Sequence, residues 1–189
     1  MKNLKTIAIA LLIAAGTFSA NAQEKKVNIN DSKINWVGKK VTGQHEGTIS
    51  LKSGVLVFKK SKLVGGNFVA DMNSIQVTDL EAGKGKEKLE GHLKADDFFG
   101  VEQHQTAKLV IKKIDEKSKG LYRATGDLTI KGITNSVNFD ISVGKDLVTT
   151  TFAVDRTKFG IKYKSKNFFE GLGDNVISDE FELTASLKY

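Results

Sequence analysis

The sequence predicts an all-β protein of antiparallel strands, and three observations lead to this prediction. Apolar and polar residues alternate with a period of two along most of the chain, as in strands with one buried face. Short turns containing glycine separate these runs, and proline is absent. After the first twenty or so residues, the clearest break in this rhythm is a segment of helical composition. Many one-sided strands are typical of a barrel or a sandwich, and alternation alone does not distinguish the two.

The chain of 189 residues begins with the features of an export signal. Two lysines precede an apolar run at residues 7–15, and Ala20-Asn21-Ala22 forms a small-x-small site before Gln23. Such a run is too short for a spanning helix, which needs about 20 apolar residues. We expect residues 1–22 to be a cleaved signal peptide, residues 23–189 to form a single domain, and the mature protein to reside in the periplasm. Because cysteine is absent, a cysteine-linked lipid anchor and disulfides are excluded.

The first half of the domain supplies four predicted strands and one helix. After a polar lead-in at residues 23–26, strands are expected at residues 34–41, 47–51 and 55–59. In the fourth strand, the apolar residues Val64, Phe68, Ala70 and Met72 share one face, and Asn67, Asp71 and Asn73 lie opposite. Residues 80–94 then turn to Glu, Lys and Leu, with Leu89 and Leu93 four apart and therefore on one helical face. We expect this short helix to lie across the end of a barrel.

The second half supplies five more predicted strands, the first at residues 107–114. In the next four, the residues expected to face inward are Tyr122, Ala124, Leu128 and Ile130; Val137, Phe139, Ile141 and Val143; Val148, Phe152 and Val154; and Ile177, Phe181, Leu183, Ala185 and Leu187. Turn residues at Lys119-Gly120, Lys131-Gly132 and residues 144–146 separate the first four of these five strands from one another. Residues 156–174 are apolar and punctuated by glycine, and we expect them to form another part of the rim.

The residues carry little indication of catalysis or metal binding. His92, Asp96, Asp97 and His104 lie close in sequence, but their spacing fits no established metal motif, and they are better explained as helix-end and turn-capping groups. No Gly-x-Ser-x-Gly elbow and no phosphate-binding glycine loop are present. We therefore expect no metal and no catalytic residue. An enzyme acting on a lipid or quinone, with His92 and Asp96 or Asp97 as acid and base, stays open as an alternative.

The net charge and the positions of the aromatic residues limit the classes of binding partner. The net charge of +7 falls to +5 without Lys2 and Lys5, and the lysines are spread along the chain, as expected for the outer face and edges of a sheet. A transient contact with an anionic membrane surface is a second interpretation. Because most aromatic residues have the inward parity of strands, we expect no nucleic-acid partner. The eleven phenylalanines fit either a packed core or a barrel lined for a long apolar ligand, and periodicity does not separate the two.

Several segments, in order, resemble the YceI-like family of exported, lipocalin-like lipid-binding proteins. They are residues 92–102 (HLKADDFFGVE), 126–134 (GDLTIKGIT), 156–161 (RTKFGI) and 172–174 (LGD), together with the strand around Trp36 and the passage through Asp71, Ser74 and Ile75. The chain departs from the family pattern at Gln105 and Ser136, where proline is usual, and at Lys131, where histidine is frequent. These are turn and strand-edge positions, so the fold is not affected.

The resemblance implies an antiparallel lipocalin-like barrel of about eight strands, a size that holds one small ligand, with a short helix and loops at one end. It also implies a bound long-chain lipid such as a polyisoprenoid, an isoprenoid quinone or a fatty amide, no other cofactor, no catalysed reaction and, as in some members, a homodimer. We expect the ligand to contact Trp36, Phe68, Met72, Leu128, Phe139, Phe152 and Phe181, with a mouth shaped by Leu93, Phe98, Phe99 and Phe159. His92 and Arg156 are the candidates to orient a polar head group. A packed barrel that acts through its surface lysines is the third hypothesis, beside the lipid binder and the enzyme.

Overall fold

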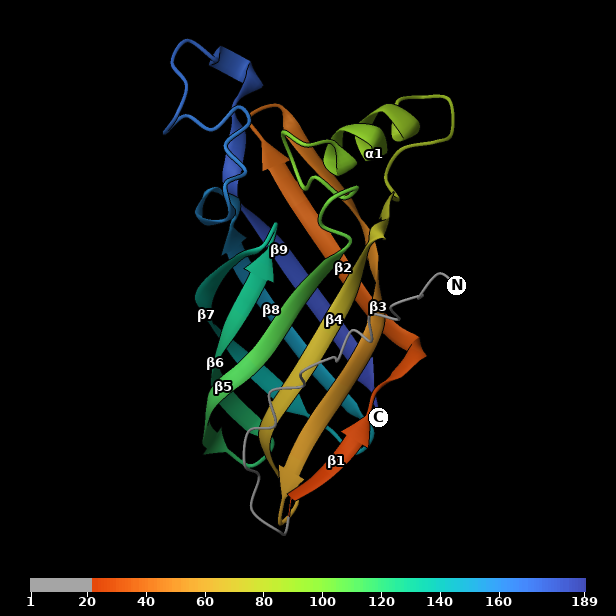
Figure 1. The fold of residues 1–189 in the computed structure, drawn as a ribbon, viewed down its shortest axis with the longest axis vertical. Coiled ribbons are helices and arrows are strands. Elements are labelled where there is room, and N and C mark those ends of the chain that lie inside the picture. The colour runs from red at the N-terminus through yellow and green to blue at the C-terminus, as the bar shows by residue number, and fades with distance from the viewer. Residues whose placement is uncertain (1–21) are drawn as a thin grey trace, which may run out of the picture.

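The computed structural model describes residues 22–189, which form a closed antiparallel β-barrel (Figure 1). Eight strands close the barrel in the order β3-β2-β9-β8-β7-β6-β5-β4, and β4 pairs again with β3. The strands are β1 (Ala22–Lys26), β2 (Asn28–Lys40), β3 (Gly43–Lys59), β4 (Lys62–Val77), β5 (Thr106–Ser118), β6 (Leu121–Ile130), β7 (Ile133–Val143), β8 (Leu147–Asp155) and β9 (Ile177–Lys188). The predicted barrel is thus confirmed, whereas the predicted signal peptide lies outside the described residues, apart from Ala22.

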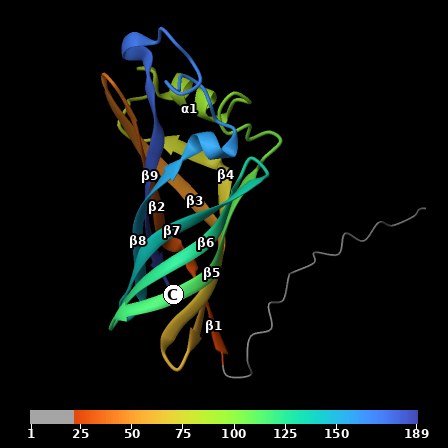
Figure 2. The ribbon, with the colours of Figure 1, turned by 90° about the vertical axis from the view of Figure 1, so that its left-hand side faces the viewer.

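One end of the barrel carries the helix and the long connections. Helix α1 (Lys86–Lys94) and the segment that holds the 3-10 helices η1 (Arg156–Phe159) and η2 (Gly173–Asn175) both lie at this end, in two views at right angles (Figures 1 and 2). The helix and the rim expected from the sequence are therefore present, although residues 80–85 form turns rather than helix. Neither α1 nor a 3-10 helix within residues 22–189 is long and apolar enough to cross a bilayer.

Two predictions for the first strands were wrong because of β-bulges and pairing. Residues 47–51 and 55–59 belong to one strand, β3, whose pairing with β4 shifts register between Thr48 and Ser50 and between Leu51 and Ser53. A bulge bends a strand without ending it, so the chain stays in one strand through residues 52–54, between the two ranges that were predicted as separate strands. The polar lead-in at residues 23–26 lies within β1, which pairs with the last residues of β3.

A third bulge reverses the parity at the start of β4. The register passes from Val57 opposite Gly65 to Phe58 opposite Leu63, which leaves Val64 without a partner. Val64 is therefore 38 % exposed, and Leu63 is buried in its place. The prediction that Val64 shares the inner face with Phe68 was wrong for this reason.

Two hairpins close with two-residue loops in which both residues have positive φ. Lys60 and Ser61 have φ of 49° and 64° between β3 and β4, and Lys131 and Gly132 have φ of 50° and 72° between β6 and β7. This is the type I′ geometry that matches the twist of paired strands, and it favours glycine or asparagine. Three of the four positions therefore hold residues that adopt this conformation at a cost.

Candidate functional site

A cavity of about 200 Å³ lies inside the barrel. Each of the eight barrel strands contributes to its wall, which is formed almost entirely by carbon atoms. Apolar cavities of about 150 Å³ stay dry and take up small hydrophobic molecules such as benzene. The interior is therefore not a solidly packed core, which removes the premise of the packed-barrel hypothesis.

The predicted ligand-contacting residues lie on this wall with one exception. Inward strand parity places those in the strands, and Leu93, Phe98 and Phe99 reach the wall from α1 and the turn after it. The predicted residues that line the cavity are Trp36, Phe68, Met72, Leu93, Phe98, Phe99, Leu128, Phe139, Phe152 and Phe181. Phe159 does not line it. Phe159 lies in η1, its side chain is 1 % exposed, and it belongs to the same buried cluster as Val154 and Ile161, so it packs in the core of the rim rather than shaping the mouth.

Other wall residues were not predicted to contact the ligand, although Ala70 was expected on the face that Phe68 and Met72 share. Ile34 and Gly38 flank Trp36 at the same parity on β2, and Ala70 lies between Phe68 and Met72 on β4. A Cβ built on Gly38 meets no atom within 4 Å, so the space beside Trp36 is open. The remaining apolar wall residues that were not predicted as ligand contacts are Ile49, Leu51, Leu56, Ile75, Ala107, Leu109, Ile111, Ile130, Ile141, Val148, Ile177, Leu183, Ala185 and Leu187. Seven of them were expected to face inward: Ile130, Ile141, Val148, Ile177, Leu183, Ala185 and Leu187.

The corner after α1 covers one end of the cavity. Leu93 comes from the last turn of α1, and Phe98 and Phe99 follow in a tight turn in which the Gly100 N–H donates to the Ala95 carbonyl at 2.8 Å. Gly100 has φ of 55°, a conformation that glycine adopts without strain. The rings of Phe98 and Phe99 meet edge to face, with centroids 5.2 Å apart. These contacts turn three apolar side chains toward the cavity.

Two more contacts fix this corner to the barrel. The Phe99 ring meets Phe181 of β9 edge to face, with centroids 6.2 Å apart. Lys131, in the turn between β6 and β7, donates from Nζ to the Asp96 carbonyl at 2.7 Å. The corner is therefore tied to two neighbouring parts of the rim.

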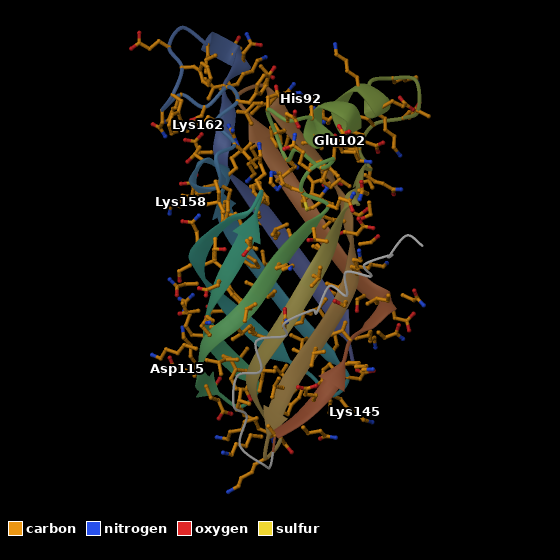
Figure 3. The ribbon with its side chains drawn as sticks, viewed as in Figure 1. His92, Glu102, Asp115, Lys145, Lys158 and Lys162 are labelled. Carbon is orange, nitrogen blue, oxygen red and sulfur yellow. The ribbon has the colours of Figure 1, made fainter. Side chains whose placement is uncertain are left out.

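His92 lies beside the cavity, not on its wall. Its ring packs against Tyr163 and Phe98, with centroids 4.5 and 5.5 Å away, and its Nδ1 is 3.8 Å from Oδ1 of the exposed Asp97. The His92 Nε2 is buried and has no hydrogen-bond partner among the described residues. Figure 3 shows His92 at the end of the barrel that carries α1. His92, Asp96 and Asp97 thus do not meet at the cavity as an acid–base pair would have to.

Within residues 22–189, no three His, Asp or Glu side chains come together in a way that could hold a metal ion. A second histidine–carboxylate pair is formed by His45 and Asp79, whose Nδ1 and Oδ2 are 2.8 Å apart. Burial raises the pKa of Asp79, but hydrogen bonds to His45 and to the Glu46 N–H outweigh burial and leave that pKa below its ordinary value. This pair lies away from the cavity wall and ties the start of β3 to the chain after β4.

Arg156 reaches the cavity wall but is largely occupied by the backbone. Its side chain is 2 % exposed, and it donates from Nε to the Ser178 carbonyl at 2.9 Å, from Nη1 to the Ile161 carbonyl at 2.8 Å and from Nη2 to the Ile177 carbonyl at 3.1 Å. Burial lowers the pKa of Arg156, and the nearby Asp179, whose Oδ1 is 3.6 Å from Nη2, opposes this effect. Arg156 therefore holds the start of β9 in place, and most of its hydrogen-bonding capacity is already used.

The pairing of β2 with β9 is irregular near one end of the barrel. Gly38 pairs with Phe181 and Lys40 with Ile177, so residues 178–180 of β9 have no partner on β2. Outside this irregularity lies a groove that is lined by Lys39, Lys40 and Lys166, among others. The groove and the cavity share Ile177, Ser178 and Glu180, so the two hollows adjoin at the bulge.

The chain is similar to known proteins in both sequence and fold. The family model described as "YceI-like domain" matches residues 25–189. A UPF0312 protein of Staphylococcus aureus (strain USA300) is 34 % identical over 88 residues, which are 41 % of this chain and 48 % of the relative. A UPF0312 protein of Staphylococcus epidermidis is 35 % identical over 112 residues, 52 % of this chain and 61 % of the relative. The chain thus spans about half the length of the curated relatives it matches.

Solved structures share the fold at low sequence identity. Burkholderia cenocepacia BcnA has a TM-score of 0.68 at 19 % identity, covering 85 % of this chain and 98 % of that one. A polyisoprenoid binding domain from Saccharophagus degradans has a TM-score of 0.58 at 12 % identity, with 88 % and 96 % covered. The Campylobacter jejuni YCEI protein has a TM-score of 0.54 at 14 % identity, with 100 % and 99 % covered. At these identities the likeness shows the fold alone.

Proposed function

The chain belongs to the YceI-like domain family, and from this we propose that it binds, without catalysis, a long apolar lipid inside its barrel. The observation that carries the proposal is the cavity whose wall of carbon atoms draws on all eight barrel strands. A polyisoprenoid is the first candidate, because a solved structure with the same fold is described as a polyisoprenoid binding domain. An isoprenoid quinone or a fatty amide has the same apolar character.

The driving force is the removal of apolar surface from water. Each CH₂ buried in such a cavity contributes about 0.8 kcal/mol. Association and the ordering of the chain cancel part of this gain, so useful affinity requires a chain that fills the cavity. Binding of this kind needs no covalent step and no metal ion.

The placement of the ionisable residues supports a binder over an enzyme. The charged residues on the cavity wall are Lys108, Arg156 and Glu180, and Arg156 already donates to three backbone carbonyls. The pair that an enzyme was expected to use, His92 with Asp96 or Asp97, lies outside the wall. Arg156 lines the cavity, and its guanidinium lies 5.8 Å from the centre of the Phe98 ring, so it is the candidate to orient a polar head group at that end.

We also propose that the protein is exported to the periplasm, on the strength of the sequence of residues 1–22. The mass of the mature protein, isolated from the periplasmic fraction of its host, tests this. Processing as proposed gives a chain that starts at Gln23. A full-length chain found in the cytoplasm would contradict the proposal.

Native mass spectrometry tests the binding function. The protein is purified from its own host by gentle extraction and is then titrated with farnesol as a prenyl probe. We expect a mass increment that corresponds to a long-chain lipid, and displacement or uptake of farnesol at one molecule per barrel. A chain that carries no lipid and takes up no farnesol would refute the proposed function.

A further inference from the structure

The end of the barrel that carries α1 also exposes a pair of aromatic rings. Phe168 and Phe169, in the loop between η1 and η2, are each 48 % exposed. The other phenylalanines within residues 22–189 are buried or half-buried. Figures 1 and 2 show this loop projecting beyond the strands in both views. Adjacent exposed aromatic residues on a projecting loop mark a contact surface.

Hydrogen bonds at the base of the loop hold the two rings in this position. Ser165 is fully buried, and its carbonyl accepts from the N–H groups of Phe168 and Phe169 at 3.1 and 3.0 Å. The Ile177 N–H donates to the Lys164 carbonyl at 3.0 Å and closes the loop onto the start of β9. The exposure of the rings is therefore built into the fold of the loop.

Several lysines belong to the same surface as the two rings. Lys162, Lys164 and Lys166 belong to the same loop, and Lys39 and Lys40 lie on the end of β2, where they line the groove together with Lys166. The Lys162 Nζ is 4.5 Å from the centre of the Phe168 ring, which is a cation–π contact. Figure 3 shows Lys162 at the same end of the molecule as His92.

The remaining charges and apolar groups of this surface fit a bilayer that carries negative charge. Residues 38–42 and 162–176 hold five lysines and the two carboxylates Glu170 and Asp174. The groove is also lined by Glu180 and by Asp179, whose Oδ1 is 3.6 Å from Arg156 Nη2, so the cations of this surface still outnumber its carboxylates. Val41, at the turn after β2, is 63 % exposed, and its N–H donates to the Val176 carbonyl at 3.2 Å, so the turn and the loop form one surface. Aromatic and aliphatic side chains enter the headgroup region, while lysines meet lipid phosphates.

We propose that residues 162–170, with Lys39, Lys40 and Val41 beside them, dock the barrel onto an anionic lipid bilayer. The proposal rests on the proposed function, because a binder of a membrane-resident chain has to meet that chain at the bilayer. The groove at this surface adjoins the cavity at Ile177 and Ser178. Docking here brings the irregular stretch of the β2–β9 pairing, and the cavity end beside it, toward the source of the ligand.

Vesicle co-sedimentation of the full mature protein tests the docking surface. The vesicles contain phosphatidylglycerol with phosphatidylethanolamine, and phosphatidylcholine vesicles serve as the neutral control. We expect binding to the anionic vesicles alone, weakened by high salt. Replacing Lys162, Lys164 and Lys166 by glutamine lowers the partition coefficient roughly fivefold per lysine and on the order of 100-fold in total.

A second variant and a matched control separate docking from a general loss of charge or fold. Phe168→Ser with Phe169→Ser keeps every charge, and we expect it to lower partitioning on the order of tenfold or more. The control is Leu121→Ser with Lys119→Gln: Leu121 is 49 % exposed and begins β6, at the far end of the barrel, where Figure 3 shows Asp115 near the end of β5. The control is expected to bind vesicles like the unchanged protein.

Equal vesicle binding by the aromatic variant and the control would overturn the proposal. So would the absence of vesicle binding by the unchanged protein, including the case in which the loop instead mediates a dimer in analytical ultracentrifugation. Farnesol binding without vesicles is measured in parallel, through the emission of Trp36 on the cavity wall. Farnesol binding without docking overturns this inference alone, whereas loop-dependent docking without farnesol binding supports the surface and refutes the proposed function.

Discussion

Filling the cavity beside Trp36 should block the ligand without harming the fold. Gly38 lies on the cavity wall, and a Cβ added there meets no atom within 4 Å, so Gly38→Leu projects its side chain into open space. The four carbons of leucine displace about four carbons of the ligand. At about 0.8 kcal/mol for each carbon, this costs about 3 kcal/mol and weakens binding on the order of 100-fold.

Farnesol titration, read by native mass spectrometry, measures this loss, and urea unfolding checks the fold. Glycine weakens a strand interior by about 0.5–1 kcal/mol relative to alanine, so the variant should be no less stable than the unchanged protein. Gly91→Leu is the matched control, because Gly91 lies on the exposed face of α1, its Cβ also meets nothing within 4 Å, and it does not line the cavity. A folded Gly38→Leu variant with the dissociation constant of the control would refute the account of where the ligand lies.

Three further predictions concern stability. Arg156→Met leaves three backbone carbonyls without their donor and should lower the free energy of unfolding in urea by about 3–5 kcal/mol. Arg123→Met, at an exposed arginine, should lower it by less than about 1 kcal/mol. Equal urea midpoints for the two variants would be evidence against the buried network around Arg156. Because the pKa of Asp79 is lowered in the folded state, the stability that its carboxylate contributes is complete above its unfolded pKa of about 4 and is lost as the pH falls through its folded pKa. Asp79→Asn should therefore be less stable than the unchanged protein at pH 6, and the difference in the free energy of unfolding should be smaller at pH 3. An equal difference at both pH values would argue against this role of the Asp79 carboxylate. Lys60→Asn with Ser61→Gly should raise the free energy of unfolding by about 1–2 kcal/mol, because both positions have positive φ; no rise in the urea midpoint would contradict the turn assignment.

Much of the cavity wall could be predicted from alternation, because a closed barrel turns one face of every strand inward. Phe139 and Phe152 illustrate this: both have inward parity, both line the cavity, and their rings stack with centroids 5.0 Å apart. Val64 shows the limit, because one extra residue in β4 reverses the parity. The neighbouring Gly65 and Gly66 are compatible with a bulge but do not fix its position. Bulges depend on how two strands pair, which is not a property of either strand alone.

The period-2 pattern of the strands does not predict whether the barrel interior is hollow. A packed core and a lined tunnel need the same alternation, and the outcome depends on whether side chains from eight strands fill the space between them. Phe98 and Phe159 show the same difficulty at the rim. Both are buried phenylalanines outside the strands, yet only Phe98 lines the cavity, because the tertiary packing of α1 and η1 decides which one faces it.

The central claim is that the barrel interior, and not its surface, holds a long apolar chain. It is tested most directly by titrating the protein with prenols and linear alcohols of increasing length while following the emission of Trp36, the single tryptophan, which lies on the cavity wall. The account predicts that affinity rises by about 0.8 kcal/mol for each added CH₂ and levels off once the cavity is full, with a change in Trp36 emission in every saturated complex. Affinity that is independent of chain length, or binding that leaves Trp36 emission unchanged, would contradict it.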